Sequence, residues 1–115
     1  MDIISEKKIA SEQEADKEIL KTLKEHGDDE NIVRPVFHYC IFNDKEALKN
    51  LLSQLKQKSI SASMTKKPLG AVITMPCDMV EENILRQIKI VSALVTNTGG
   101  TYDGWETSIE KNKER

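Results

Sequence analysis

The chain has 115 residues, the usual length of one domain with a single hydrophobic core. Hydrophobic residues make up 38 %, charged residues make up 31 %, and the net charge is −2, which disfavours both a disordered chain and a strongly basic nucleic-acid module. The sequence contains no apolar run long enough to span a bilayer and no signal-peptide pattern at its N-terminus, so we expect a cytoplasmic protein.

The first predicted element is a helix that begins at Ser11, because Ser11 and Glu14 have the spacing of a capping box. Gly27 provides a natural C-terminal stop for this helix. We expect residues 1–10 to form a separate N-terminal segment and residues 28–31 to form a polar connection. The apolar positions of the helix form a narrow stripe of Ala15, Ile19, Leu20 and Leu23.

Residues 34–42 are mostly β-branched and aromatic, and they predict a strand with Pro35 near its start. Apolar residues on both sides of the pleat predict a central strand that is at least partly covered on both faces. Asn43 and Glu46 then have the spacing of a second helix cap. The helix that follows is the clearest amphipathic segment, with Leu48, Leu51, Leu52 and Leu55 on one face.

Two strands are predicted next, over residues 59–64 and 69–75. The first alternates with period two, which is typical of an edge strand. The break between them, residues 66–68, is short enough for a hairpin.

A third amphipathic helix is predicted to open at Asp78, with an acidic residue in its first turn, and to end at residues 99–100, which are both glycine. Residues 101–109 are expected to form the last strand, and residues 110–115 a charged tail that frays. The apolar face of this helix consists of Ile84, Leu85, Ile88, Val91, Leu94 and Val95.

This order of elements predicts an α+β fold, a ferredoxin-like two-layer sandwich over residues 11–109, with an extra N-terminal helix. Right-handed crossovers place both crossover helices on one face of a four-stranded antiparallel sheet with strand order 4-1-3-2. The core positions predicted on the crossover helices are Leu48, Leu51, Leu55, Ile84, Ile88 and Val91.

His38 and Cys40 are two apart on a predicted strand, so they should project to the same face. They suggest either a Cys–His nucleophile pair or a packed thiol beside an ordinary sheet histidine. No orienting group or oxyanion loop accompanies them, so we favour the second interpretation and expect no catalytic residues. Asp103 and Glu106 are three apart on a strand, which predicts opposite faces rather than an acid/base pair.

The two cysteines, Cys40 and Cys77, belong to no CxxC motif and have no histidine at metal-ligand spacing, so we expect no metal site and no cofactor. On neighbouring antiparallel strands they should lie near opposite edges of the sheet, roughly 20 Å apart at the usual rise per residue. A disulfide requires Cα atoms within about 7 Å, so free thiols are predicted.

The segment Tyr102-Asp103-Gly104-Trp105 holds the only tryptophan and one of two tyrosines. Glycine within a strand indicates a bulge or a close backbone approach, and Trp and Tyr are enriched at interaction hot spots. Either Trp105 anchors the last strand onto the helices, or these four residues form a partner-binding site. Both hold if the motif shapes a surface while its ring fills the core. We predict a bulge at Gly104, a bond from Asp103 to a local backbone amide, and a Tyr102 hydroxyl near the surface.

Residues 99–107, Gly-Gly-Thr-Tyr-Asp-Gly-Trp-Glu-Thr, are similar to the C-terminal Tyr-Asp-Gly-Trp signature of the bacterial RraB family, the protein inhibitors of ribonuclease E. Upstream, residues 19–29 resemble the family's first helix and its Gly-Asp-like turn. Residues 36–42 resemble its first strand, and residues 71–77 the strand before its last helix. The resemblance covers roughly residues 14–109.

The resemblance implies a ferredoxin-like domain without catalytic residues, which binds ribonuclease E and lowers its RNA-cleaving activity. It does not identify a small-molecule cofactor. Relatives can carry a strongly acidic C-terminal extension, whereas this sequence stops at Arg115 after a mixed-charge tail. If acidic charge drives contact with a basic partner segment, this chain binds another target or binds more weakly. The alternative is a direct RNA-binding module that stacks bases on Phe37 and Tyr39, although its basic surround is weak.

Overall fold

The computed structural model describes residues 3–111, with side chains from residue 14 onward. Within this span the elements follow in the order α1 (Ile3–Glu25), β1 (Arg34–Ile41), α2 (Lys45–Gln57), β2 (Ser61–Lys66), β3 (Leu69–Cys77), α3 (Glu81–Asn97) and β4 (Thr101–Thr107). The strands form one antiparallel sheet in the order β2-β3-β1-β4, which is the predicted order read from the other edge. The predicted α+β architecture is therefore confirmed.

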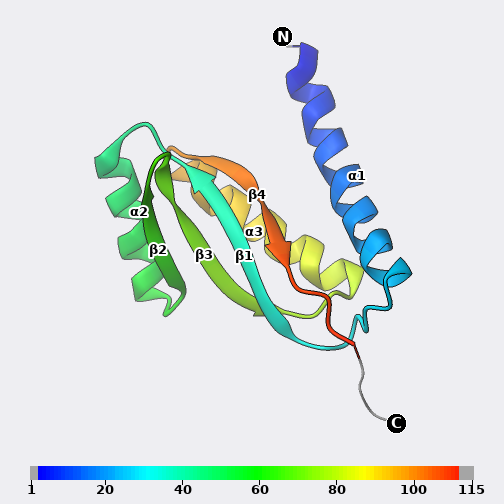
Figure 1. Ribbon diagram of the computed structural model, residues 1–115. Coiled ribbons are helices and arrows are strands. Elements are labelled where there is room, and N and C mark those ends of the chain that lie inside the picture. The colour runs from blue at the N-terminus through cyan, green and yellow to red at the C-terminus, as the bar shows by residue number, and fades with distance from the viewer. Residues whose placement is uncertain (1–2, 112–115) are drawn as a thin grey trace.

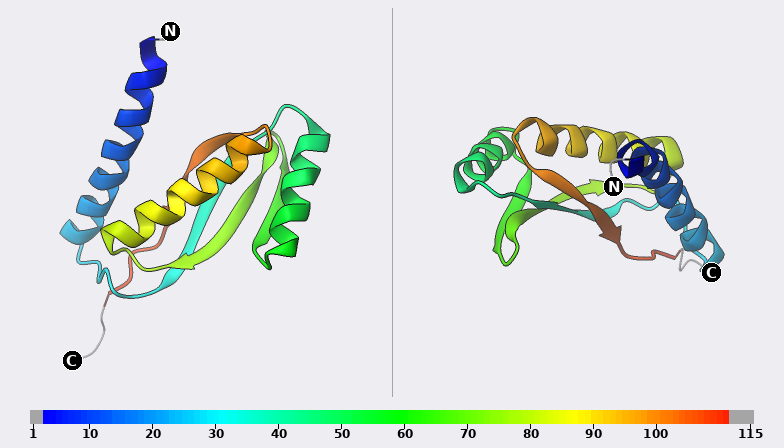
Figure 2. Two further views of the ribbon diagram at one scale, coloured as in Figure 1. Left: turned by 180° about the vertical axis from the view of Figure 1, so that it is seen from behind. Right: turned by 90° about the horizontal axis from the view of Figure 1, so that it is seen from above.

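Within residues 3–111, helices cover one face of the sheet and leave the other face uncovered. Figure 1 looks onto the uncovered face, with α2 and α3 behind the strands, and Figure 2 shows both helices on the same side. Helix α1 stands beside the α3 end of the sandwich, next to β4. Strand β1 is central as predicted, but the expectation of cover on both its faces is wrong, because both crossover helices pack on one side.

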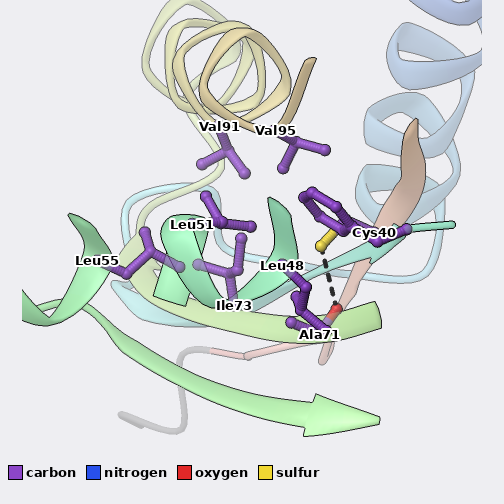
Figure 3. Close-up of a cluster of buried hydrophobic side chains, with 9 residues drawn as sticks. Cys40, Leu48, Leu51, Leu55, Ala71, Ile73, Val91 and Val95 are labelled. Atoms are coloured by element: carbon purple, nitrogen blue, oxygen red, sulfur yellow. Dashed lines mark hydrogen bonds between the residues drawn. The ribbon is translucent and has the colours of Figure 1, made fainter. Parts of the chain in front are cut away.

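The core lies between the sheet and the two crossover helices. All six predicted core positions on α2 and α3 are buried, and Leu48, Leu51 and Ile84 have no exposed surface. Figure 3 shows the α2 leucines packed against Ile73 of β3 and the α3 valines. Burial of these side chains supplies most of the driving force that holds the helices on the sheet.

Helix α1 begins at Ile3, so the predicted start at Ser11 is wrong. The preceding residues 6–10, Glu-Lys-Lys-Ile-Ala, are mostly good helix formers, and the helix therefore runs through the capping-box sequence. Its predicted end at Gly27 is confirmed by a positive φ of 89° and by a bond of 3.0 Å from the Asp28 amide to the Leu23 carbonyl. Among residues 14–25, where the side chains are described, the buried stripe is narrower than predicted and consists of Leu20 and Leu23.

Two boundaries around α2 differ from the prediction by one or two residues. The cap is Asp44 rather than Asn43, since its carboxylate accepts a bond of 3.1 Å from the Glu46 amide. Strand β2 begins at Ser61 rather than at residue 59, because Ser59 has a φ of 60° and belongs to the turn that ends α2. Left-handed residues are common one position past a helix end.

Asp78 precedes α3 instead of capping it. The helix starts at Glu81, and the Asp78 carboxylate accepts bonds from the Val80 amide and the Asn83 side chain, which shape the turn from β3 into the helix. Strand β4 ends at Thr107, two residues earlier than predicted. Glu110 is fixed rather than frayed, because its amide and carbonyl both bond to the α1–β1 loop. The rest of the predicted tail, residues 112–115, lies outside the described residues.

Candidate functional site

Strand β4 carries a bulge opposite Tyr39 of β1. Asp103 and Gly104 together occupy the place of one residue in the pairing, and Gly104 has a φ of 108°. The bulge predicted at Gly104 is therefore confirmed. The extra residue shifts the alternation of the strand, so that Tyr102 and Trp105, three apart, both face the helices.

The Tyr102 hydroxyl points into the sandwich, and the prediction that it lies near the surface is wrong. It is 2.7 Å from Nδ1 of His38, a side chain with no exposed surface. Nε2 of His38 is 2.7 Å from the Gln87 side-chain oxygen, and the Gln87 nitrogen donates to the Pro76 carbonyl. This fixes Nε2 as a donor and Nδ1 as an acceptor, so Tyr102 donates to His38. Burial lowers the pKa of His38, which favours this neutral form, although the hydrogen bond to Gln87 acts in the opposite direction.

Trp105 joins β4 to α1. Its side chain is buried in a cluster with Leu20 of α1 and Ile84 of α3, and its indole nitrogen donates a bond of 2.8 Å to the Asp16 carboxylate. The interpretation of Trp105 as an anchor for the last strand is therefore confirmed. Two of the four predicted partner-binding residues, Tyr102 and Trp105, contribute to the interior, while Asp103 is exposed.

His38 and Cys40 face the same side of β1, as predicted, and both are buried beneath the helices. The Cys40 thiol lies 3.6 Å from the Ala71 carbonyl within the core cluster (Figure 3). Burial raises its pKa, which disfavours the nucleophilic thiolate. Cys40 thus packs as a small hydrophobe. It pairs with Ala71 while Cys77 pairs with Arg34, so the two free thiols lie at opposite ends of the β1–β3 ladder.

The uncovered face of the sheet carries the exposed part of the motif. Asp103 and Glu106 both lie on this face, and their predicted placement on opposite faces is wrong, because the bulge reverses the alternation between them. The bond predicted from Asp103 to a local backbone amide is not found within residues 14–111. A bulge adds one residue to a strand and so reverses the face to which the later residues point. The bulge predicted at Gly104 therefore implies that Asp103 and Glu106 lie on the same face.

Two aromatic residues of β1 stand beside these carboxylates. Phe37 pairs directly with Glu106 across the ladder, and Tyr39 lies opposite the bulge that holds Asp103. The pKa of the Tyr39 hydroxyl is raised by partial burial, and further by the nearby Glu106 carboxylate. We call Phe37, Tyr39, Asp103 and Glu106 the acid–aromatic patch. Of these, Asp103 belongs to the predicted partner-binding site, Phe37 and Tyr39 were predicted only for the RNA-binding alternative, and Glu106 was not predicted for either.

A separate cluster of buried polar groups surrounds Arg34, the first residue of β1. The Arg34 guanidinium donates to the Asp28 carboxylate at 2.6 Å, and both side chains are 1 % exposed. Arg34 also donates to the carbonyls of Ile32, Asp29 and Ser108, so every guanidinium nitrogen has a partner. The cluster joins the α1–β1 loop to the segment after β4, and its role is structural.

Among the side chains of residues 14–111, no three His, Cys, Asp or Glu residues are grouped so that they could hold a metal ion. Within residues 3–111, no helix is both long enough and apolar enough to cross a membrane.

The family model for RraB, described as regulator of ribonuclease activity B, matches residues 13–107. This span runs from α1 to the end of β4 and confirms the resemblance seen in the sequence. No curated protein matches the chain.

Proposed function

The chain belongs to the RraB family, and from this premise we propose that it is a non-catalytic cytoplasmic regulator that lowers ribonuclease E activity by binding the enzyme. The family description supplies the broader role, regulation of ribonuclease activity. The mode of action, by binding rather than by chemistry, rests on the arrangement of the side chains.

The observation that carries the proposal is that the side chains with catalytic potential are buried, whereas the side chains on the accessible face of the sheet are suited to binding. His38 is fully buried and hydrogen-bonded through both ring nitrogens, and Cys40 is 3 % exposed. A nucleophile and its base must reach the substrate, which this pair, beneath the helices, does not. The accessible sheet face instead presents aromatic rings and carboxylates, which suit recognition of a protein surface.

Direct RNA binding is the rival function, because Phe37 and Tyr39 lie on a sheet face open to a ligand. The carboxylates of Asp103 and Glu106 flank those rings, and they would repel a phosphate backbone. This arrangement favours a protein partner over RNA.

The test measures cleavage of a short labelled single-stranded RNA by ribonuclease E as the chain is added. We expect the initial rate to fall and saturate with increasing protein, and we expect no cleavage by the chain alone. Cys40→Ala should inhibit as well as the parent does. An unrelated ribonuclease acting on the same RNA should be unaffected.

Each alternative gives a different result. Cleavage by the chain alone, lost in Cys40→Ala, would make it an enzyme. Protection of the RNA from both ribonucleases would mean that the chain covers the RNA rather than the enzyme. An unchanged rate with ribonuclease E would reject the proposed partner.

A further inference from the structure

We propose that the acid–aromatic patch binds an arginine-rich segment of the protein partner, laid across β1 and β4 on the uncovered face of the sheet. The inference rests on the proposed function and deepens it, since it names the surface used and the chemistry of the segment recognised. Two independent features of the patch, its charge and its aromatic rings, point to the same occupant.

The charge of the uncovered face is one-sided. Among the strand residues that point to this side, Asp103 and Glu106 are the charged ones, and both are acidic. Strands β2 and β3 contribute small polar and aliphatic side chains there, such as Ser63 and Val72. The hairpin lysines, at residues 66–67, lie at the far edge of the sheet, three strands or about 14 Å from β4. A cationic segment therefore meets an attractive field over β1 and β4.

The aromatic rings distinguish arginine from a generic cation. Phe37 pairs with Glu106 across the ladder, and Tyr39 lies opposite the bulge that holds Asp103. A planar guanidinium can stack on such a ring while it donates to the neighbouring carboxylate. An ammonium group has no planar surface for stacking, so arginine should bind better than lysine.

The bulge is what brings these groups together. In a regular strand Asp103 and Glu106 would lie on opposite faces, and one carboxylate would be turned toward the helices. The positive φ of Gly104 places both on the uncovered face and both β4 aromatics inside. A single backbone feature thus builds the interior contacts and the acidic surface.

The experiment titrates the full chain against a short fluorescent peptide of alternating arginine and serine and follows anisotropy. The peptide with citrulline in place of arginine is the neutral control. The test variant is Asp103→Asn with Glu106→Gln. The matched variant is Glu46→Gln with Glu82→Gln, on exposed positions of α2 and α3, and both double changes raise the net charge from −2 to 0.

We expect the parent to bind the arginine peptide, more weakly as salt rises, and to bind the citrulline peptide much less. The patch variant should lose about fivefold or more in affinity, and the helix variant less than about twofold. Equal loss in the two variants would mean that net charge alone attracts the peptide, and it would overturn the proposal. So would absence of peptide binding by the parent.

Single-stranded RNA of similar length is the third ligand. Tighter binding of RNA than of the peptide, improved further in the patch variant, would assign the face to RNA and reject our inference. Ribonuclease E inhibition separates this inference from the proposed function. Full inhibition of ribonuclease E by the patch variant would reject the patch as the binding surface but would agree with the proposed function. Absence of inhibition by the parent would reject the proposed function even if the peptide binds.

Discussion

The Tyr102 hydroxyl donates a hydrogen bond of 2.7 Å to Nδ1 of His38, and this contact fastens the edge strand β4 to the central strand β1 from inside the sandwich. The imidazole has no exposed surface, and its second nitrogen donates to the Gln87 side chain. A buried neutral histidine with both nitrogens hydrogen-bonded makes the fold sensitive to acid, because protonation would remove the acceptor that Tyr102 uses.

The first prediction concerns pH. Burial lowers the pKa of His38 in the folded chain below the ordinary value of 6.5, despite the opposing bond to Gln87. In acid the unfolded chain then takes up a proton that the folded chain resists. The free energy of unfolding should be at its full value above pH 6.5 and fall as the pH drops through the folded pKa, by about 1.4 kcal/mol for each unit of pKa depression. Urea melts at pH 7.5, 6.5 and 5.5 measure this.

His38→Gln is the control, since glutamine does not titrate. The other histidine, His26, is exposed and is present in both proteins. The loss of stability between pH 7.5 and 5.5 should therefore be smaller in the variant than in the parent. Parallel pH profiles would contradict a linkage to His38.

The second prediction concerns the ion pair of Arg34 and Asp28, whose side chains are each 1 % exposed. Arg34→Met should lower the free energy of unfolding by about 3–5 kcal/mol, because it leaves a buried carboxylate without its cation. Asp28 oxygen Oδ2 is already buried without a hydrogen-bond partner within the described residues, so the site has no spare donor. Denaturant melts measure the change.

The double variant Arg34→Met with Asp28→Asn tests the cause. Removing the buried charge together with its partner should recover part of the lost stability, which a double-mutant cycle quantifies as a coupling energy. Arg34→Lys should also destabilise, since an ammonium cannot reach the four acceptors of the guanidinium. Additive single effects would show that the two side chains are not coupled.

The third prediction concerns the core. Leu51 has no exposed surface, and it packs among the α2 and β3 side chains of Figure 3. Leu51→Ala should cost about 2–5 kcal/mol through lost burial and a residual cavity. Leu52, the next residue on α2, is only partly buried, and its alanine variant should cost clearly less. Equal costs, or a Leu51 cost below about 0.5 kcal/mol, would contradict the packing.

The contrast between these residues shows what the sequence alone can predict. Leu48, Leu51 and Leu55 recur at helical spacing. Because this periodicity is visible within a short stretch of sequence, it predicts directly which face of the helix is buried. The strand order followed from the sequence of elements and the handedness of crossovers. Element ends were less predictable, because α1 continues through a capping sequence and Ser59 belongs to a helix-terminating turn.

Contacts between distant residues have no such local signal. Nothing near His38 in the sequence indicates Tyr102, 64 residues away, and nothing near Asp28 indicates that its carboxylate will bond to Arg34 and Glu110. The patch was an intermediate case. Gly104 in the motif indicates a bulge, but the alternation of a regular strand places Tyr102 outside and puts Asp103 and Glu106 on opposite faces.

The fourth prediction returns to Gly104, on which both the interior contacts and the patch depend. A Cβ added there would meet no atom within 4 Å, so crowding is not an obstacle. The φ of 108° is the obstacle, because L residues rarely adopt it. Gly104→Ala should therefore lower the free energy of unfolding by about 1–2 kcal/mol. It should also weaken arginine-peptide binding, since strain at the bulge disturbs the placement of Asp103.

Gly104→Asn separates backbone strain from size. Asparagine is larger than alanine, but it tolerates positive φ several-fold better than most residues. If the backbone conformation sets the cost, the asparagine variant should melt at a higher temperature than the alanine variant and bind the peptide more tightly. If steric contact with a neighbour sets the cost, the order of the two variants should reverse, and the bulge would then not be what holds Asp103 and Glu106 on one face.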